Sequence, residues 1–244
     1  MECLKEVIKQ GNFDCSPNGV SLQGVDSGFV ALIQLTLRAE GFERYNVDHN
    51  MNLGIDIENL VKVLKCGGNN DKLTLSAADG GNKLTVILES PEQDRVSTFS
   101  LKLMDIETEN FGVPATTYKC IVRMPSSELQ RICRELSAIG EDVRISVSKS
   151  GITFAVEGNS DSGSITLSPT ESEKEGPAVQ IKVEDAIEQK FGLRYLINFA
   201  KASVVSDTVT LMLTKEVPLV VEYKFGELGH LRYFLAPKID DADE

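Results

Sequence analysis

The stretch LVKVLKCGGNNDKLTLS, residues 60–76, contains a helix, a stop and a strand in seventeen residues. Its helix begins a little earlier, because one apolar stripe at spacings i, i+3, i+4 and i+7 runs through Ile57, Leu60, Val61 and Leu64. Gly67 is a typical helix stop. After it, apolar and polar residues alternate as in a half-buried strand. A helix followed by a hairpin is therefore the unit that the rest of the chain should be compared with.

The same helical stripe occurs three more times. Its members are Leu129, Ile132, Cys133 and Leu136; Leu193, Leu196, Ile197 and Ala200; and, in a shorter version ending before Gly11, Leu4, Val7 and Ile8. Strand-like alternation fills most of the remaining chain, as in DKLTLSAADGGNKLTVILE (71–89) and VRISVSKSGITFAVEG (143–158). Few helices among many turn-bounded strands predict an α+β fold dominated by antiparallel sheets.

These units also suggest an internal duplication. When Gly19 is aligned with Gly151, Leu4 falls on Leu136; when Asp71 is aligned with Asp207, Lys65 falls on Lys201. We therefore expect two similar domains, 1–102 and 119–244, joined by an acidic connector over 103–118 that contains Gly112 and Pro114. The second half opens with the strand-like YKCIVRM, for which the first half has no counterpart. Either that strand is missing, which would leave an open sheet edge in the first half, or another segment replaces it.

Composition limits the function classes. The 244 residues are 41% hydrophobic and 25% charged, which is typical of a soluble globular protein, and the formal net charge is −12. Such an acidic surface argues against general binding to nucleic acid but leaves room for a local basic patch. The cysteines form no CxxC pair, and we expect all five to be reduced and buried. They are Cys3, Cys15, Cys66, Cys120 and Cys133.

Every expected helix carries cations off its buried stripe. On the first helix Lys5 shares a face with Lys9, and the other helices carry Lys62, Lys65, Arg131, Arg134, Arg194 and Lys201. Taken singly, each pair is explained by an ordinary solvated helix surface, because Lys and Arg are mostly exposed. Four such faces in a duplicated chain favour a second interpretation. Helices gathered on one side would form a basic surface that attracts a phosphate backbone without reading bases, and the acidic excess would lie on the opposite side.

A resemblance covers essentially the whole chain. LTLRAEGFERY (35–45), VKVLKCGGNND (61–71), LKLMDIE (101–107), MPSSELQRICRELSAIGE (124–141), LRYLINFAKAS (193–203), VPLVVEYKFGELGHLRYFLAPKI (217–239) and the acidic end DDADE occur in order. Together with FGVP (111–114), they strongly resemble the proliferating cell nuclear antigen family, the eukaryotic DNA sliding clamps.

The resemblance implies a nuclear ring of three subunits with helices inside, sheets outside and duplex DNA through the hole. By residue match, the DNA-facing cations would be Lys5, Lys62, Lys65, Arg131, Arg134, Arg194 and Lys201. Subunits would meet along the edge strands 95–102 and 162–168, with Phe99, Ile165 and Leu167 at the contact. The implied function is that of a DNA polymerase processivity factor in replication and repair.

The resemblance also implies a pocket that binds short partner peptides. Its matching positions are Val25, Phe29, Val30, Leu32, Phe111, Val113, Pro218, Phe234, Ala236 and Pro237. Without the resemblance, Val25, Val30 and Leu32 would be assigned to strand core. The implied partners are polymerases, a flap nuclease, DNA ligase and a clamp loader, and Lys149 matches a ubiquitin acceptor whose other interpretation is a solvated turn lysine.

The chain departs from the family pattern in two places. The usual opening strand and helix start have no match, which puts ring closure in question, and Phe29 stands where the family usually has histidine at the pocket rim. The matched family needs no cofactor, and we predict no catalytic or metal-binding residues.

Two rival functions remain open. One is a non-replicative interaction scaffold of the same fold, such as a checkpoint-type clamp subunit. The other is a metal-dependent enzyme built on carboxylates, for which the candidates are Asp105, Glu107, Glu109, Asp240, Asp241, Asp243 and Glu244. No phosphate-binding glycine loop or nucleophile motif accompanies these carboxylates, and His49 and His230 have no evident Ser or Cys partner.

Overall fold

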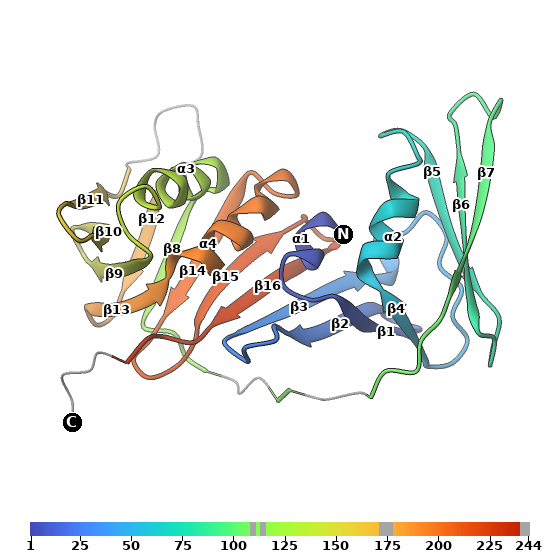
Figure 1. The fold of residues 1–244 in the computed structure, drawn as a ribbon, viewed down its shortest axis with the longest axis horizontal. Helices are drawn as coiled ribbons and strands as arrows, with labels where there is room; N and C mark the ends of the chain where they lie inside the picture. The colour runs from blue at the N-terminus through green and yellow to red at the C-terminus, as the bar shows by residue number, and fades with distance from the viewer. Residues whose placement is uncertain (108–110, 113–115, 171–177, 240–244) are drawn as a thin grey trace.

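A computed structural model describes residues 1–107, 111–112, 116–170 and 178–239 (Figure 1). This part of the chain consists mainly of antiparallel strands, with helices lying along one side of the sheets. Among the described residues, no helix has both the length and the apolar character needed to cross a membrane. The prediction of an α+β fold is confirmed.

The largest sheet has nine strands in the order β12-β8-β14-β15-β16-β3-β2-β1-β4. In that order the strands are Gln180–Val183, Cys120–Pro125, Thr208–Leu213, Leu219–Lys224, Gly229–Leu235, Ala31–Arg38, Gly19–Val25, Gln10–Ser16 and Met51–Asp56. The two halves of the chain meet inside this sheet, because β16 pairs with β3 through seven aligned residue pairs. One hydrogen-bonded sheet therefore spans both halves.

Two smaller sheets complete the fold. The four-stranded sheet has the order β11-β10-β9-β13 and consists of Ser162–Leu167, Gly151–Glu157, Asp142–Ser148 and Ile187–Gly192. The three-stranded sheet has the order β5-β6-β7 and consists of Lys72–Ala77, Lys83–Glu89 and Val96–Lys102. These two sheets lie at opposite ends of the molecule (Figure 1).

Three helices follow their apolar stripes. They are α2 (Ile57–Leu64), α3 (Ser126–Leu136) and α4 (Leu193–Ala200). Only α3 extends beyond its stripe, beginning three residues before Leu129. The Asp56 side chain caps α2 by accepting a hydrogen bond from the Asn59 N–H at 2.8 Å. Short 3-10 turns, η1 (Ala39–Gly41) and η2 (Lys201–Val204), follow β3 and α4.

The first helix is shorter than predicted. Helix α1 covers only Glu2–Lys5, because the N–H groups of Val7 and Ile8 both bond to the Leu4 carbonyl and close a turn there. Lys9 lies beyond the helix, so the expectation that Lys5 and Lys9 share a helix face is wrong. The apolar Leu4 and Ile8 are nevertheless buried in the core.

The helices form one continuous row. Helix α3 packs on α4 and η2, η2 contacts α1 through Lys201, and α1 packs on α2 (Figure 1). Their apolar stripes cover the core, where Leu60, Leu129 and Leu196 are almost completely buried. The charged residues of the row are thereby left on its outer side.

The strand pairing shows the internal duplication. It also shows that, in the part of the chain that the structure describes, the first half lacks one strand of the pattern found in the second half. Strands β1 to β4 repeat the pairing of β9, β10, β11 and β13, and β5 follows α2 as β14 follows η2. Strand β14 is paired on both sides, by β8 and β15, whereas within the described residues β5 pairs only with β6. Leu73 and Leu75 of β5 are 46% and 50% exposed. Of the two alternatives for the first half, the open edge is thus the one present.

The described part of the connector, 103–107, 111–112 and 116–118, contains one isolated bridge and no helix or strand. That bridge joins Met104 to Gly54, and the Asn12 side chain donates to the Ile106 carbonyl at 3.0 Å. The division at 102/103 and 118/119 stays a prediction.

Four cysteines are buried, as predicted, but Cys66 is exposed. It follows α2 in a turn, where its Sγ lies 3.5 Å from the Lys62 carbonyl oxygen. The apolar stripe of that helix ends at Leu64, so the next residues are not drawn into the core.

Candidate nucleic-acid interface and peptide pocket

The first candidate site is the outer side of the helix row. Of the seven cations assigned to it, five lie on α1 to α4, Lys65 is the C-terminal cap of α2, and Lys201 lies in η2, which follows α4. Most are well exposed: the side chains of Lys62, Lys65 and Arg131 retain 64%, 62% and 60% of their accessible surface. This surface carries charge from both halves of the chain.

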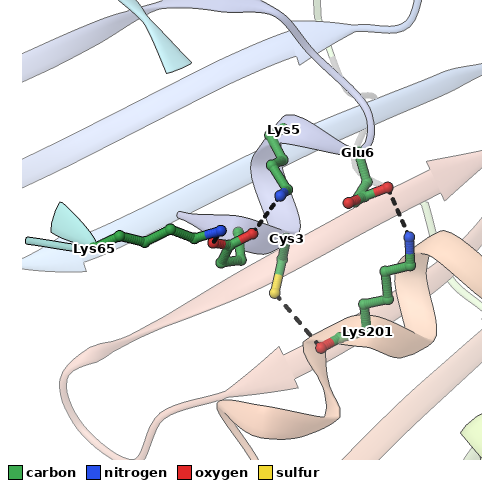
Figure 2. Close-up of polar contacts among 6 residues, drawn as sticks. Cys3, Lys5, Glu6, Lys65 and Lys201 are labelled. Carbon is green, nitrogen blue, oxygen red and sulfur yellow. Dashed lines mark hydrogen bonds and ion pairs between the residues drawn. The ribbon is translucent and has the colours of Figure 1, made fainter. Parts of the chain in front are cut away.

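Glu2 lies between two of these cations. Its carboxylate is 2.6 Å from Lys5 Nζ and 2.8 Å from Lys65 Nζ, so Lys5 and Lys65 approach one acid group from different helices (Figure 2). Hydrogen bonds from Lys5 and then from Lys65 lower the Glu2 pKa from 4.5 to about 2. The group is ionised at physiological pH and neutralises part of the charge around it.

Lys201 connects the second half of the chain to α1. Its Nζ donates to Glu6 Oε2 at 2.7 Å, and its carbonyl oxygen lies 3.7 Å from Cys3 Sγ (Figure 2). These contacts join positions almost two hundred residues apart in the sequence. They bring Lys201 to the same group of side chains as Lys5 and Lys65.

Cations on the other helices also face carboxylates of their own helix. Arg131 Nε donates to Glu135 Oε1 at 2.8 Å, and Lys62 Nζ lies 3.3 Å from Glu58. Sequence reasoning found the cations but missed these acids, although i, i+4 spacing is a visible signal for both pairs. The helix row is therefore a mixed surface in which several cations already have an anionic partner.

Arg194 differs from the other cations in its contacts. Its guanidinium carbon lies 4.7 Å from the centre of the Tyr195 ring, and its Nη2 donates to the Tyr195 hydroxyl at 2.9 Å. That hydroxyl donates in turn to Asp26 Oδ2 at 3.3 Å. The start of α4 is thus linked to the turn between β2 and β3, which borders the second candidate site.

The second candidate site is an apolar hollow of about 290 Å³ on the side of the nine-stranded sheet away from the helices. Eight of the ten predicted pocket residues line it: Val25, Phe29, Val30, Leu32, Phe111, Pro218, Phe234 and Ala236. Pro237 lies outside the lining, and Val113 lies outside the described residues. Val25, Val30 and Leu32 are half-buried, and Val30 also packs against the core, so the strand-core interpretation holds only in part.

Sequence reasoning missed part of this lining. Ala31, Gly112, Thr116, Tyr118 and Val217 also border the hollow. Tyr118 and Thr116 belong to the end of the connector, and the FGVP motif beside them was the available signal. The connector and the sheet therefore form the hollow together.

Phe29 stands at the rim of the hollow with its side chain 74% exposed. Its φ of 54° is unusual for a residue with a side chain. The turn is held by Asp26 Oδ1, which accepts hydrogen bonds from the N–H groups of Val30 and Ala31 at 2.8 and 2.7 Å. The fold thus presents an aromatic ring to solvent beside an apolar hollow.

The candidate subunit contacts lie at the two ends of the molecule. Strand β7 is an edge of the three-stranded sheet and β11 an edge of the four-stranded sheet (Figure 1). Phe99 on β7 and Ile165 and Leu167 on β11 are half-buried and pack partly against the core. Lys149 is exposed in the turn between β9 and β10.

The described part of the chain shows no assembled metal site for the rival enzyme. Within the described residues, no group of three or more His, Cys, Asp or Glu side chains could hold a metal ion. Glu109 and the acidic end lie outside those residues. His49 lies 3.2 Å from Asp79, while His230, whose pKa is lowered mainly by burial, lies on β16.

Comparison with protein-family models agrees with this two-part architecture. The model described as proliferating cell nuclear antigen, N-terminal domain, matches residues 1–111, and the model described as proliferating cell nuclear antigen, C-terminal domain, matches residues 112–238. The two matches meet in the connector, between the two halves that the duplication predicts. The chain belongs to the proliferating cell nuclear antigen family of DNA sliding clamps, which act as processivity factors and not as enzymes.

Proposed function

We propose that three copies of this chain close into a ring around duplex DNA in the nucleus and tether DNA polymerases during replication and repair. The observation that carries this proposal is the helix row, in which cations from both halves lie along one side of the molecule. A duplex could contact such a row through its phosphates without base-specific contacts.

The pairing of these cations with carboxylates is compatible with sliding. A lysine that leaves Glu2 or Glu6 to meet a phosphate exchanges one anion for another, so the net gain is small. Weak, interchangeable contacts hold a duplex near the row while allowing it to move. Retention would then come from the closed ring and not from affinity.

Ring closure would use the two edge strands. Because β7 and β11 lie at opposite ends of the molecule, pairing β7 of one copy with β11 of the next is a head-to-tail contact. Such contacts form a ring when the rotation closes, and they cover edges that would otherwise be open. Phe99, Ile165 and Leu167 would supply the apolar part of the contact.

The apolar hollow would receive partner proteins. Its volume and lining fit a short helical plug with aromatic side chains, a common form of peptide recognition. Polymerases, a flap nuclease, DNA ligase and a clamp loader are the proposed partners. Lys149, in its exposed turn, would be accessible as a ubiquitin acceptor.

Retention on circular and linear DNA tests the clamp proposal. After loading by an ATP-dependent clamp loader, the protein should stay on a nicked circle and leave within seconds when the circle is cut. In direct duplex-binding assays, Arg131→Gln/Arg134→Gln should lower the slope of log K against log[salt] by about 1 to 2 units. The control Arg44→Gln/Lys83→Gln, which removes the same charge from exposed positions off the row, should leave the slope unchanged.

Equal retention on circular and cut DNA would contradict encirclement. An unchanged salt slope in Arg131→Gln/Arg134→Gln would contradict the assignment of the helix row. A single-chain mass with intact peptide binding would instead favour an interaction scaffold of the same fold.

A further inference from the structure

The face of the nine-stranded sheet away from the helices carries an ordered row of polar side chains. Cross-strand register aligns Gln180, Arg123, Thr210, Glu222, Arg232 and Gln34 on six neighbouring strands, from β12 to β3. Successive residues of a strand face opposite sides, and the neighbours Val122, Leu211 and Val221 are buried in the core. The polar row therefore lies on the outer face.

One end of this row borders a second hollow, of about 420 Å³, over β12, β8, β14 and β15. Its charged lining consists of Arg123, Lys182, Lys224 and Glu222. We call this hollow the basic groove. Within the described residues, Arg123 and Lys182 have no carboxylate within ion-pair distance. The outer face is consequently not the uniformly acidic shell that the net charge of −12 suggests.

Glu222 does not cancel the positive charge of the basic groove. Its side chain is only 4% exposed, lies 3.4 Å from Lys224 and accepts a hydrogen bond from Arg232 Nε at 2.6 Å. Two cations thus hold a single buried carboxylate. Arg123 and Lys182 add two further positive charges, which gives the groove a net attraction for anions.

The basic groove and the peptide pocket lie on the same face and in line. Register places Leu32, Phe234, Val220, Met212 and Ile121 on one line across β3, β16, β15, β14 and β8. Leu32 and Phe234 line the peptide pocket, and Met212 and Ile121 line the groove. Four steps of about 4.8 Å separate the end strands, roughly 19 Å, which about six residues of extended chain would span.

Arg232 connects the two hollows. It pairs with Glu222 of the groove, and its charge acts on Tyr118 of the pocket, whose pKa is raised mainly by burial and lowered to a smaller extent by Arg232. A peptide leaving the pocket along this face would therefore pass Arg232 before it reaches the cations of the groove.

We propose that the basic groove binds an acidic segment of the same partner whose aromatic plug occupies the peptide pocket. This inference rests on the proposed function of the pocket and adds a second contact, about six residues from the first. Charge complementarity carries it, since a cationic groove in so acidic a chain discriminates strongly between acidic and neutral segments.

The test uses matched pairs of synthetic peptides. Every peptide carries a one-turn helical plug with two aromatic residues, a six-residue Gly/Ser spacer and a four-residue extension, which is all Asp in one member of the pair and all Asn in the other. One pair has the extension before the plug and the other pair has it after the plug. In one of the two orders, the Asp peptide should bind about three- to tenfold more tightly at low salt, and the advantage should disappear near 1 M salt.

Matched variants separate the groove from the pocket. Arg123→Gln/Lys182→Gln should remove the advantage of the Asp peptide and leave binding of the Asn peptide unchanged, whereas Arg44→Gln/Lys83→Gln should change neither. Phe234→Ala should weaken both peptides alike. Equal affinity of the Asp and Asn peptides for the wild type in both orders would contradict the proposed role of the groove alone. Failure of both peptides to bind would contradict the proposed role of the pocket as well. Reduced duplex binding by Arg123→Gln/Lys182→Gln would show a phosphate site and overturn the peptide assignment.

Discussion

At the scale of single residues, the cations of the helix row face two kinds of carboxylate: those on their own helix and those that folding brings from distant positions. A rotation of 100° per residue separates Lys65 and Arg131 from the buried stripes, because helix geometry alone sets the angle. Glu2 and Glu6 reach Lys65 and Lys201 only after distant parts of the chain have packed, and no local spacing indicates that. The backbone of Phe29, with its positive φ, is likewise imposed by the Asp26 turn and is not visible in a pattern of residue types.

The residue-scale prediction concerns the pH range over which the Glu2 ion pairs stabilise the fold. The folded state lowers the Glu2 pKa to about 2, so the contribution of these ion pairs to stability is complete above 4.5 and is lost as the pH falls towards 2. Lys5→Gln should raise the Glu2 pKa more than Lys65→Gln does, because Lys5 is the larger cause. NMR titration of the Glu2 carboxyl carbon measures this directly.

A neighbouring lysine provides the control for that titration. Lys62→Gln removes an equal charge from α2 but breaks the contact with Glu58 and not one with Glu2. It should leave the Glu2 titration unchanged. An unaltered pKa in both Lys5→Gln and Lys65→Gln would mean that Glu2 is not held between them.

At the scale of helices and strands, sequence patterns were most reliable where one face is buried. The stripes of α2, α3 and α4 give their bounds closely, because the core requires those apolar positions. Helix α1 ends early because the Leu4 carbonyl accepts hydrogen bonds from the N–H groups of both Val7 and Ile8. The spacing of apolar residues does not reveal this turn. The order of strands in the sheets, including the β16–β3 junction, was not predicted, because it depends on pairing between segments far apart in the sequence.

The open edge of β5 gives the element-scale prediction. Leu75 is half-exposed on a strand that pairs only with β6 among the described residues, an arrangement that favours association with other chains. Leu75→Lys should slow concentration-dependent aggregation and change the free energy of unfolding by no more than about 0.5 kcal/mol. Light scattering and urea denaturation measure the two effects.

Leu84→Lys on the paired strand β6 is the contrasting variant. Leu84 is only 2% exposed, so burying an ammonium there should unfold the sheet. If Leu75→Lys aggregates as fast as the wild type, the β5 edge is not the surface through which chains associate.

At the scale of the whole molecule, the proposed ring makes a prediction that only a head-to-tail assembly satisfies. Phe99→Asp on β7 and Ile165→Asp on β11 should each lower the mass in solution from three chains to one, because each damages one of the two end surfaces. Mixed together, the variants should form a two-chain species through their remaining intact edges. Sedimentation velocity distinguishes these masses.

Phe29→Asp is the matched control, since it introduces the same charge at an exposed phenylalanine in the turn between β2 and β3, which belong to the nine-stranded sheet and to neither edge strand. It should keep the three-chain mass. Circular dichroism must show that Phe99→Asp and Ile165→Asp remain folded. Folded variants that keep the three-chain mass would contradict the assignment of β7 and β11.

The junction of β16 and β3 has a mechanical consequence. Seven aligned residue pairs connect the two halves there, so bending the chain between them would require breaking a backbone ladder in the middle of a wide sheet. Each chain should accordingly move as a single rigid body. Opening of the proposed ring to admit DNA should therefore occur by separation or rotation at the interfaces between neighbouring subunits.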